Sequence, residues 1–448
     1  PSDASGNAFA SLLAPDRQIG VAFPSSLPAY ITTTRDTDGR EFAPFSAAQV
    51  QATQSALSYL QTVVDLQFVA VADANASNVI ALANNRQNDS AGYARYPSES
   101  NEGSDVFLSI APEQQNDEPI AGRYGALTLI HEISHALGLK HPFADPNHAD
   151  EGDAVLPATD ETVRWTVMTY NNQAEADKAF WVSQLRPLDI AALQYLYGPS
   201  PATRAGNDTY RVGASNPARA DDITLITAEQ PSFIWDGGGN DTIDASQSPT
   251  PVTVSLEPGH RGWITTWAPS ITAPGQITVN FGTRIESLVG SAFGDRLFGN
   301  TLDNRIEGGS GNDQIAAGEG VDQLIGGPGE GNDTISGGAG ADPMSGNAGD
   351  DLFLALGSGD RVWGGTGLDE ARFDAPSSQF RARQVATPEG SQWRIEKAET
   401  GWVTATLAGV ERVVFTDKTL TASELQAGAL SSAGTGQIWH WGSHAVLT

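Results

Sequence analysis

A nine-residue repeat occupies the chain between residues 290 and 372 and limits the folds that this part can adopt. Nine successive units carry an acidic or amide side chain at one position and an apolar residue two positions later. A flexible Gly/Asp linker does not need an apolar residue in register nine times, so we predict short strands that share one core, as in a parallel β-roll. The polar series is Asp295, Asn304, Asp313, Asp322, Asp333, Asp342, Asp351, Asp360 and Asp369.

The glycines and aspartates of this repeat predict calcium-binding turns. Glycine tolerates a positive φ, so a tight turn can point its carbonyl groups inward, and aspartate adds a carboxylate. These oxygens suit Ca²⁺, which takes about six to eight of them. Besides the aspartates of the series, we expect calcium ligands at Gly309, Gly311, Gly327, Gly338 and Gly340.

Two nonapeptides per turn would divide the polar series between two edges of the roll. We expect the first edge to bind calcium better, because the second contains Asn304, whose amide offers only a neutral oxygen. The fifth unit has eleven residues, so we expect one loop to bulge there. The first edge would hold Asp295, Asp313, Asp333, Asp351 and Asp369, and the second Asn304, Asp322, Asp342 and Asp360.

The charge balance also points to metal ions. The chain has 54 acidic and 25 basic residues, a net charge of −29 and no cysteine. No disulfide can form, nucleic-acid binding would need a basic face, and no apolar run approaches the ~20 residues of a membrane span. A folded chain of this charge repels itself unless cations form part of the structure. We expect divalent cations, no nucleic-acid partner, no membrane attachment and a monomer.

The first half of the chain has a different pattern, typical of a mixed α/β domain. Ser46 predicts a helix N-cap, Pro187 predicts the first turn of another helix, and the link 198–206 is rich in Pro, Gly and Ala. We therefore predict two domains, at residues 1–200 and 201–448, the second all-β with a C-terminal β cap. The predicted helices are 46–64, 125–137 and 187–196, and the predicted strands are 18–23, 67–71, 79–82 and 106–110.

The segment HEISHALGLKH, residues 131–141, carries the chemistry of the first half. His131 and His135 are four residues apart on one helix face, so both imidazoles can reach one ion. Gly138 permits the turn that ends the helix and returns His141 as a third ligand. Three His with an open position are the catalytic type of zinc site, and Glu132 beside the first ligand can act as the general base and acid.

The downstream segment TVMTY adds two candidate residues, Met168 and Tyr170. After the histidine motif, Met168 is typical of a Met-turn that packs its thioether under the histidines. Tyr170 lies two residues later, and its phenol could reach the zinc or the developing oxyanion.

Together these motifs resemble the serralysins, a metzincin family of secreted bacterial zinc endopeptidases. The resemblance spans nearly the whole chain and includes PLDIAALQYLYG after the Met-turn, the segments AGYARYP and SDVFLSI before the motif, and the glycine-rich repeats. It implies a metzincin-like zinc protease domain followed by a parallel β-roll or β-sandwich domain of the RTX type. It also implies that Tyr170 is a fourth zinc ligand and a transition-state hydrogen-bond donor, that Met168 is structural, and that His131, His135 and His141 bind zinc.

The same resemblance implies calcium sites between the domains. Three short segments match the family's pattern: RAGND, WDGGGND and TRIES. Arg284 stands where the family usually has Thr, so only its backbone oxygen is expected to bind. Ser291 and Phe293 replace two glycines of the first half-turn, which leaves that half-turn doubtful. The implied ligands are Arg204, Gly206 and Asp208, then Asp236, Gly238, Gly239 and Asp241, and finally Arg284 and Glu286.

We therefore predict a secreted, calcium-stabilised zinc metalloendopeptidase of broad specificity, with protein or peptide substrates and a protein inhibitor as partners. Residues 1–15 show neither the basic nor the long apolar segment of a signal peptide, so we expect either that a leader or pro-segment was removed or that export uses another signal. The resemblance to the serralysins implies bacterial type I export. One alternative is a calcium-dependent adhesin or surface-layer protein with a vestigial peptidase domain. Another is a metallohydrolase that acts on a non-peptide substrate.

Overall fold

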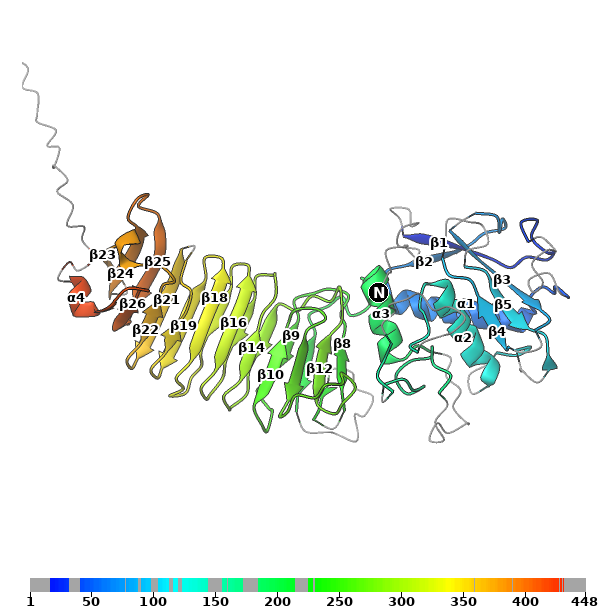
Figure 1. Cartoon of the computed structure of the whole chain (residues 1–448), viewed down its shortest axis with the longest axis horizontal. Coiled ribbons are helices and arrows are strands. Elements are labelled where there is room, and N and C mark those ends of the chain that lie inside the picture. Colours follow the sequence, from blue (N-terminus) through cyan, green and yellow to red (C-terminus); the bar gives the residue numbers. More distant parts are fainter. Residues whose placement is uncertain are drawn as a thin grey trace, which may run out of the picture. The chain divides into compact units, whose positions relative to one another are not determined.

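The chain forms two compact units: residues 1–247 with 253–287, and residues 248–252 with 288–448. Figure 1 shows the elements of each unit along the sequence. The predicted domain boundary after residue 200 follows the last long helix and stays a prediction. The computed structural model describes residues 17–31, 41–76, 78–87, 90–97, 104–112, 116–119, 123–143, 155–158, 160–171, 184–213, 225–228, 230–357, 359–388, 390–426, 428 and 430.

A five-stranded sheet forms the framework of the first unit, with strand order β2-β1-β3-β5-β4. Neighbouring strands pair in parallel from β2 through β1 and β3 to β5, and β4 pairs antiparallel with β5 at the edge of the sheet. Every residue of β3 and β5 is buried, because these central strands are covered on both faces. The strands are β1 (Gln18–Ala22), β2 (Gln67–Ala70), β3 (Val79–Asn85), β4 (Gly92–Ala94) and β5 (Val106–Ser109).

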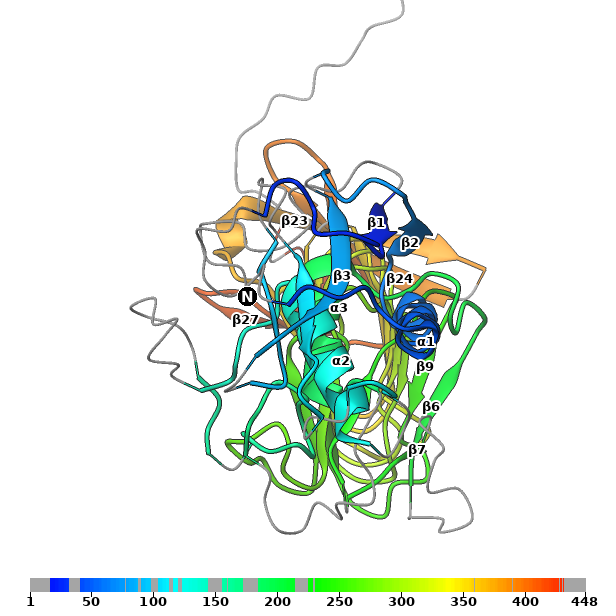
Figure 2. The ribbon, with the colours of Figure 1, turned by 90° about the vertical axis from the view of Figure 1, so that its right-hand side faces the viewer.

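Three helices accompany this sheet, and α1 and α2 lie on the same side of it (Figure 1, Figure 2). Helix α1 (Ala47–Val63) begins after Ser46, whose side chain accepts a hydrogen bond from the backbone N–H of Gln49. Helix α2 (Tyr124–Ala136) is buried from Gly125 to its last residue, and α3 (Pro187–Tyr197) begins with Pro187. All three predicted helices are confirmed.

One apolar core joins these elements. It contains Leu57 and Leu60 of α1, Ile130 and Ile133 of α2, and Leu193 of α3, together with inward side chains of β1, β3 and β5. Three of these side chains, Leu60, Ile133 and Leu193, have no exposed surface. Because α2 is enclosed by this core, its polar side chains have fixed positions, and those side chains include the histidine motif.

The rest of the first unit is a group of short strands. Strand β6 pairs in parallel with β7 and β9, while β12 pairs in parallel with β8 and antiparallel with β11. The loop after β12 reaches α3, since Asn280 Nδ2 donates to Gln194 Oε1 at 2.9 Å. The strands are β6 (Thr209–Val212), β7 (Leu225–Ile226), β8 (Ser232–Ile234), β9 (Thr242–Asp244), β10 (Val252–Ser255), β11 (Arg261–Ile264) and β12 (Gln276–Val279).

The repeats form the predicted parallel β-roll. Strands alternate between two sheets, so that β14, β16, β18, β20 and β22 follow one another in one sheet, and β13, β15, β17, β19 and β21 in the other (Figure 1). The bounds are β13 (Ser287–Val289), β14 (Arg296–Phe298), β15 (Arg305–Glu307), β16 (Gln314–Glu319), β17 (Gln323–Ile325), β18 (Thr334–Ala339), β19 (Pro343–Ala348), β20 (Leu352–Phe353), β21 (Asp360–Thr366) and β22 (Glu370–Arg372).

The recurring apolar residue fills the space between the two sheets. Neighbouring turns stack these side chains in register, as in the pairs Leu297–Ile315 and Ile315–Ile335. The long fifth unit makes the connection 326–333 between β17 and β18, compared with 308–313 between β15 and β16, so the predicted bulge is confirmed. At most 2% of the surface is exposed on Leu297, Ile306, Ile315, Leu324, Ile335, Met344, Phe353, Val362 and Ala371.

The C-terminal end of the roll is closed by antiparallel strands. Strands β23 (Phe380–Thr387), β24 (Gly390–Lys397) and β25 (Val403–Ala408) extend one sheet beyond β21. On the other sheet, β26 (Arg412–Val414) and β27 (Thr419–Thr421) follow β22, and α4 (Ala422–Gln426) comes next. The sequence pattern predicted an all-β second half without helices, so the helix α4 differs from this prediction. It is a single short turn whose buried residue is Leu425. None of the helices in the described ranges is long and apolar enough to span a bilayer.

Candidate metal centres and active-site cleft

The three motif histidines converge on one point. His131 and His135 project from α2, and His141 follows the turn after this helix. The Nε2 atom of His141 lies 3.1 Å from Nε2 of His135 and 3.4 Å from Nε2 of His131. Three nitrogen ligands of a tetrahedral zinc ion, each at about 2.0–2.1 Å, are separated by roughly 3.3 Å. The donor set and its spacing therefore fit zinc.

Backbone carbonyl groups fix the orientation of two of these rings. His131 Nδ1 lies 2.7 Å from the Val167 carbonyl oxygen, and His135 Nδ1 lies 2.7 Å from that of Leu139. A carbonyl can only accept, so Nδ1 of each ring carries the proton and Nε2 presents its lone pair to the shared point. Gly138, at φ 99°, makes the turn that brings the Leu139 carbonyl back toward His135.

Asp189 supports this arrangement from the first turn of α3. Its Oδ1 accepts from Thr166 Oγ1 at 2.6 Å, and its Oδ2 accepts from the backbone N–H groups of Val167 at 2.8 Å and Arg186 at 2.9 Å. Burial raises the pKa of Asp189 to about 6, although these hydrogen bonds act in the opposite direction. The carboxylate thus fixes Val167, whose carbonyl holds His131. The sequence signal for this role was a helix-capping Asp two residues after Pro187.

Glu132 lies beside the histidines in a buried position. Its side chain is 6% exposed, and its Oε2 has no hydrogen-bond partner among the described residues. Burial raises the pKa of Glu132 to about 8, and burial also lowers the pKa of His131 to about 4. The imidazole is therefore neutral, as a metal ligand must be, and the carboxyl group is able to gain and lose a proton near neutral pH.

A cleft of about 400 Å³ opens in front of Glu132, between α2, the edge strand β4 and the Met-turn. Gly92 of β4 lies directly over Glu132, since a Cβ at this position would be 2.9 Å from Glu132 Cγ and 3.0 Å from Thr128 Cγ2. Sequence reasoning missed this role of Gly92, because the contact depends on a strand and a helix that are far apart in the chain. The cleft is lined by Ser90, Ala91, Gly92, Tyr124, Leu127, Thr128, His131, Glu132, Val167, Thr169 and Tyr170.

The two candidate residues of the segment TVMTY differ in burial. Met168 is 2% exposed and belongs to the apolar core that includes Ile130 and Ile133 of α2, and its packing under the histidines stays a prediction. Tyr170 is 64% exposed, and its ring centre lies 4.6 Å from that of His141 and 5.7 Å from that of His131. The structure thus places the phenol ring of Tyr170 at the edge of the histidine cluster.

The loop that carries Tyr170 is anchored by residues on both sides. Thr169 Oγ1 donates to Glu161 Oε1 at 3.2 Å, and Asn171 Nδ2 donates to the Glu161 carbonyl at 3.1 Å. The adjacent Asp160, 3% exposed, accepts from Ser270 Oγ at 2.7 Å and, in addition, from a threonine of the same β11–β12 connection. Sequence reasoning missed this link as well, because its partners are 110 residues apart.

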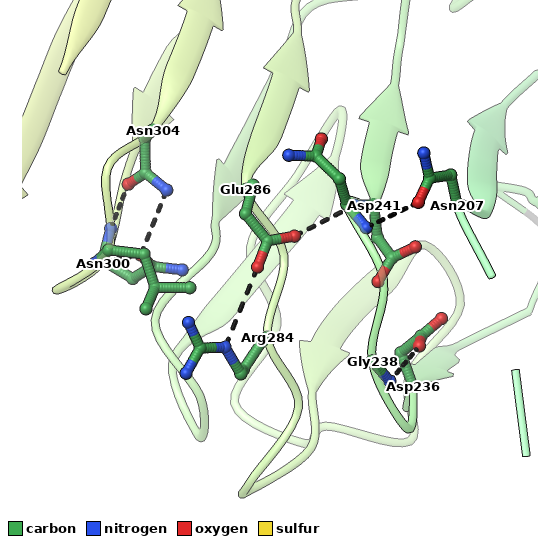
Figure 3. A network of polar contacts seen from close by, with 10 residues as sticks. Asn207, Asp236, Gly238, Asp241, Arg284, Glu286, Asn300 and Asn304 are labelled. Atoms are coloured by element: carbon green, nitrogen blue, oxygen red, sulfur yellow. Dashed lines mark hydrogen bonds and ion pairs between the residues drawn. The ribbon is translucent and has the colours of Figure 1, made fainter. Parts of the chain in front are cut away.

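The three aspartates predicted at the domain junction form a second cluster, and Figure 3 shows two of them, Asp236 and Asp241. One carboxylate oxygen from each of Asp208, Asp236 and Asp241 lies within 4.8 Å of the others. Glu286 joins them, because its Oε2 accepts from the backbone N–H of Asp241 at 3.0 Å. Burial, followed by the nearby Asp236, Glu286 and Asp208, raises the pKa of Asp241 to about 6. Asp241 Oδ2 has no partner among the described residues, so this cluster fits a divalent cation.

The remaining junction residues surround this cluster. Gly206 and Gly239 are in close contact, since a Cβ on Gly239 would fall 1.9 Å from the Gly206 carbonyl oxygen. Gly238 donates its N–H to Asp236 Oδ1 at 2.9 Å. The side chain of Arg204 turns away to Trp235, and that of Arg284 makes an exposed ion pair with Glu286 at 3.8 Å. The backbone oxygens of both arginines stay predictions as ligands.

The repeat aspartates form two ladders, as predicted for two nonapeptides per turn. In the first ladder, the backbone N–H groups of Asp295, Asp313, Asp333 and Asp351 each donate to the carboxylate of the next member, at 2.8–2.9 Å. In the second ladder, Asn304, Asp322 and Asp342 donate in the same way to the next member, at 2.7–3.1 Å. Each carboxylate is thereby held by the turn before it.

The second carboxylate oxygen separates seven of the eight aspartates into two groups. Asp295 and Asp360 use both oxygens in hydrogen bonds, to Ser291 and Val252 in the first case and to Asp342 and Gly357 in the second. The other group keeps a buried Oδ2 without a partner in the described part of the chain, and this group consists of Asp313, Asp322, Asp342, Asp351 and Asp369. Buried, unpaired carboxylate oxygens in such a row fit calcium.

Asn304 behaves differently from its acidic neighbours. Its Oδ1 accepts from the Asn300 backbone N–H at 2.8 Å, and its Nδ2 donates to Asn300 Oδ1 at 3.1 Å (Figure 3). This amide is therefore occupied by its own turn. The weaker calcium binding predicted for this edge has a physical basis at Asn304 and stays a prediction for the edge as a whole.

The predicted repeat glycines lie where the chain leaves no space for a side chain. Gly309 has a φ of 104°, and a Cβ there would be 2.0 Å from the Ser291 carbonyl oxygen. Gly327, at φ 152°, would place a Cβ 1.5 Å from the Gly309 carbonyl oxygen. Similar contacts with the preceding turn apply to Gly311, Gly338 and Gly340.

Comparison with known proteins agrees with both metal centres. The family model of the RTX calcium-binding nonapeptide repeat matches residues 224–247, 298–330, 329–353 and 340–370. The fold and the histidine site thus define a metzincin-like domain with an RTX β-roll, and the predicted fold class is confirmed.

The curated relatives that the chain matches are serralysins and related metalloproteases. Serralysin G of Dickeya chrysanthemi is 30% identical over 264 residues, 57% of this chain and 54% of the relative. Metalloprotease AprA of Pseudomonas entomophila (strain L48) is 32% identical over 217 residues, 46% of this chain and 44% of the relative. Serralysin of Proteus mirabilis is 38% identical over 138 residues, which are 29% of this chain and 28% of the relative. The chain spans about half or less of the length of these relatives, and the predicted resemblance to the serralysins is confirmed.

Proposed function

We propose that this protein is a secreted zinc metalloendopeptidase of broad specificity that is stabilised by calcium. The observation that carries this proposal is the geometry around α2. Three imidazole Nε2 atoms meet at one point beside Glu132, a buried carboxyl group with an unpaired oxygen, in a cleft bounded by an edge strand. The relatives named serralysin and metalloprotease support the same assignment.

His131, His135 and His141 would hold the zinc ion, with Tyr170 near the remaining position. When bound, zinc would supply a Lewis acid that polarises a peptide carbonyl and lowers the pKa of water. Glu132 accepts a proton at a carboxylate oxygen as water attacks the scissile carbonyl, and it then donates this proton to the leaving amine. Its pKa of about 8 suits both roles near neutral pH. The Tyr170 hydroxyl group donates a hydrogen bond to the developing oxyanion.

Strand β4 suggests how a substrate binds. It lies at the edge of the sheet, so one side of its backbone can pair with an extended peptide. Gly92 presents no side chain at the point closest to Glu132, which leaves room for a peptide backbone there. Binding through backbone hydrogen bonds tolerates many side chains, and we therefore propose unfolded proteins such as casein as substrates.

The roll provides the calcium dependence and the link to secretion. Its unpaired carboxylate oxygens and the match to a calcium-binding repeat support calcium as its ligand. Because an extracellular medium supplies millimolar calcium, we propose that the protein works outside the cell after type I export, as a monomer that a protein inhibitor can block. The relatives and the repeat support secretion in general.

The test compares casein hydrolysis by the wild-type chain and by Glu132→Gln, both loaded with calcium and with their zinc content measured. We expect the variant to keep its zinc and to lose at least ~10³-fold in activity, because the proton acceptor is gone. Asp350→Asn, an exposed carboxylate on the roll, is the matched control and should keep full activity. Treatment with 1,10-phenanthroline should abolish the wild-type activity.

Full activity of Glu132→Gln would overturn this mechanism. A zinc-loaded wild-type chain that cleaves neither casein nor short peptides would instead favour a metallohydrolase with a non-peptide substrate. A chain that binds calcium but no zinc would favour an adhesin or surface-layer protein.

A further inference from the structure

A groove with a volume of about 430 Å³ lies on the roll, where β21 meets the antiparallel strands β24 and β25. Along β21 the burial alternates, so that Asp360 and Val362 face the core while Arg361 and Trp363 are exposed. The groove is far from the histidine motif in sequence and belongs to the second unit. Its lining includes Arg361, Trp363, Gln392, Arg394, Val403 and Thr406.

The strand register places cationic side chains on both walls of this groove. Arg361 of β21 pairs with Thr406 of β25, and Thr406 pairs in turn with Arg394 of β24. Arg383 of β23 then pairs with Arg394, so these residues form one row across four strands. With strands about 4.8 Å apart, the backbones of Arg361 and Arg394 are separated by roughly 10 Å, and Thr406 lies between them.

This row is positively charged in a strongly acidic protein. Three guanidinium groups are accompanied by one carboxylate, since Glu396 lies 2.8 Å from Arg383 Nε and 3.7 Å from Arg394 Nε. Arg361 has no ion pair among the described residues. These four groups carry a local charge of about +2, in contrast to the net charge of −29 for the chain. Calcium binding by the roll does not need such a row, because guanidinium groups repel cations.

The chemistry of the lining selects the ligand. Guanidinium groups bind carboxylates through paired hydrogen bonds, so Arg361 and Arg394 favour a ligand with two acidic groups. Trp363, 37% exposed, offers a flat apolar surface on which a sugar ring can pack. Gln392 and Thr406 can bond hydroxyl groups between the two arginines. We propose that this groove binds a short acidic oligosaccharide built from uronic acid units.

The size and charge of the site favour a short ligand over a long polyanion. The chain carries a net charge of −29, which disfavours a long polyanion such as nucleic acid, whereas the local positive row acts within a Debye length of about 8 Å. Salt should therefore weaken the binding only moderately. This site is independent of the proposed peptidase activity, so variants of the groove should cleave casein as the wild type does.

The test measures the binding of hexagalacturonate to the calcium-loaded full chain by titration calorimetry and by tryptophan fluorescence, with maltohexaose as the neutral control. We expect hexagalacturonate to bind and maltohexaose to bind at least ~10-fold more weakly. The double variant Arg361→Gln/Arg394→Gln should lose at least ~10-fold in affinity, and Trp363→Ala should lose about 5-fold and most of the fluorescence change.

A charge-matched control removes two arginines elsewhere on the roll. Arg372 and Arg412 both pair with Glu370 in the opposite sheet, and the double variant Arg372→Gln/Arg412→Gln should bind hexagalacturonate as the wild type does. Equal binding of both sugars, unchanged affinity in the groove variants, or an equal loss in the control would overturn the proposal. Tighter binding of a single-stranded DNA oligonucleotide than of hexagalacturonate would also overturn it. Calcium-dependent melting shows whether each variant is folded. If the groove variant Arg361→Gln/Arg394→Gln is not folded, Arg361→Lys takes its place.

Discussion

The two metal-binding regions of this protein hold their ligands in opposite ways. In the histidine cluster the ligands are neutral, and carbonyl groups of Val167 and Leu139 already orient two of the rings. In the roll the ligands are carboxylates, each held through one oxygen by a backbone N–H group, while five of them keep the second oxygen buried and unpaired. The first arrangement is oriented by the protein's own carbonyl groups, whereas the second gathers negative charge that bound calcium or protons must offset.

This difference indicates which property of the protein each metal affects. Zinc enters a framework built by an apolar core and long-range hydrogen bonds, so its main effect is chemical. Calcium enters a structure whose own groups repel one another, so its binding free energy is also folding free energy. We therefore expect the removal of calcium to change stability and the removal of zinc to change activity.

Metal removal gives the largest expected effect. Each calcium site filled to 100 times its Kd adds about 2.7 kcal/mol of stability, and several sites act together. EGTA should therefore lower the melting temperature of the roll by about 10 °C or more in circular dichroism at the β-sheet signal. Zinc removal with 1,10-phenanthroline in the presence of calcium should leave that transition unchanged. An equal shift from both chelators would erase the contrast between the two regions.

A pair of neighbouring aspartates gives the next effect. Asp351 is 1% exposed and accepts from the Asp333 backbone N–H at 2.8 Å, whereas Asp350 is exposed. Asp351→Ala leaves a buried N–H group without its acceptor and removes a calcium ligand, so we expect a loss of about 1–3 kcal/mol in calcium. Asp350 also accepts a backbone N–H, that of Leu368 at 2.8 Å, but this bond is exposed and water can replace it, so Asp350→Ala should change stability by less than ~0.5 kcal/mol. Urea unfolding in the presence of calcium measures both free energies. Equal losses would contradict the assignment of Asp351, and not Asp350, to the calcium sites.

The support of the histidine cluster is tested by a change at Asp189. Asp189→Asn places an amide N–H group against the backbone N–H donors of Val167 or Arg186, so Val167 no longer holds His131 in place. We expect a 10–100-fold weaker zinc affinity in a competition titration, with the calcium-dependent melting of the roll unchanged. Asp351→Ala, as the reverse control, should keep the wild-type zinc affinity. Unchanged zinc affinity in Asp189→Asn would show that the cluster does not depend on this support.

The smallest expected effect is a pH dependence of the calcium-free roll. Burial raises the pKa of Asp313 to about 8 and the pKa values of Asp322 and Asp333 to about 7, from an ordinary value of 3.8. The folded roll then binds more protons than the unfolded chain between about pH 4 and 8, so its stability falls as the pH rises through this window. In EGTA, melting at pH 8 should occur a few degrees below melting at pH 6. Saturating calcium should remove or reverse this trend, because calcium competes with protons.

Local patterns predicted much of this structure. The fixed spacing of His131 and His135 needs only a helix to bring them together, and Gly138 ends that helix where the turn requires it. The roll is equally local, because each repeat contacts its neighbours and the apolar register is visible in the sequence. The two ladders followed from one assumption, that two repeats make one turn.

Contacts between distant segments were not predictable in the same way. Asp189 and His131 cooperate through Val167, and Asp160 reaches Ser270 across 110 residues. Neither pair leaves a spacing pattern, because the fold of the whole first unit decides which segments meet. The arginine row on β21 and β24 likewise depends on the strand register, which cannot be read from the sequence.

The aspartate ladders also have a direction. Each amide in the first ladder is bonded by the carboxylate of the turn that follows it, and the last amide, that of Asp369, donates to Glu411 Oε2 at 2.9 Å. The row of amides therefore needs an acceptor beyond its last repeat, and Glu411 supplies it from outside the repeats. This glutamate ends the ladder as a capping residue ends a helix, so the C-terminal strands complete the hydrogen bonding of the roll as well as covering its end.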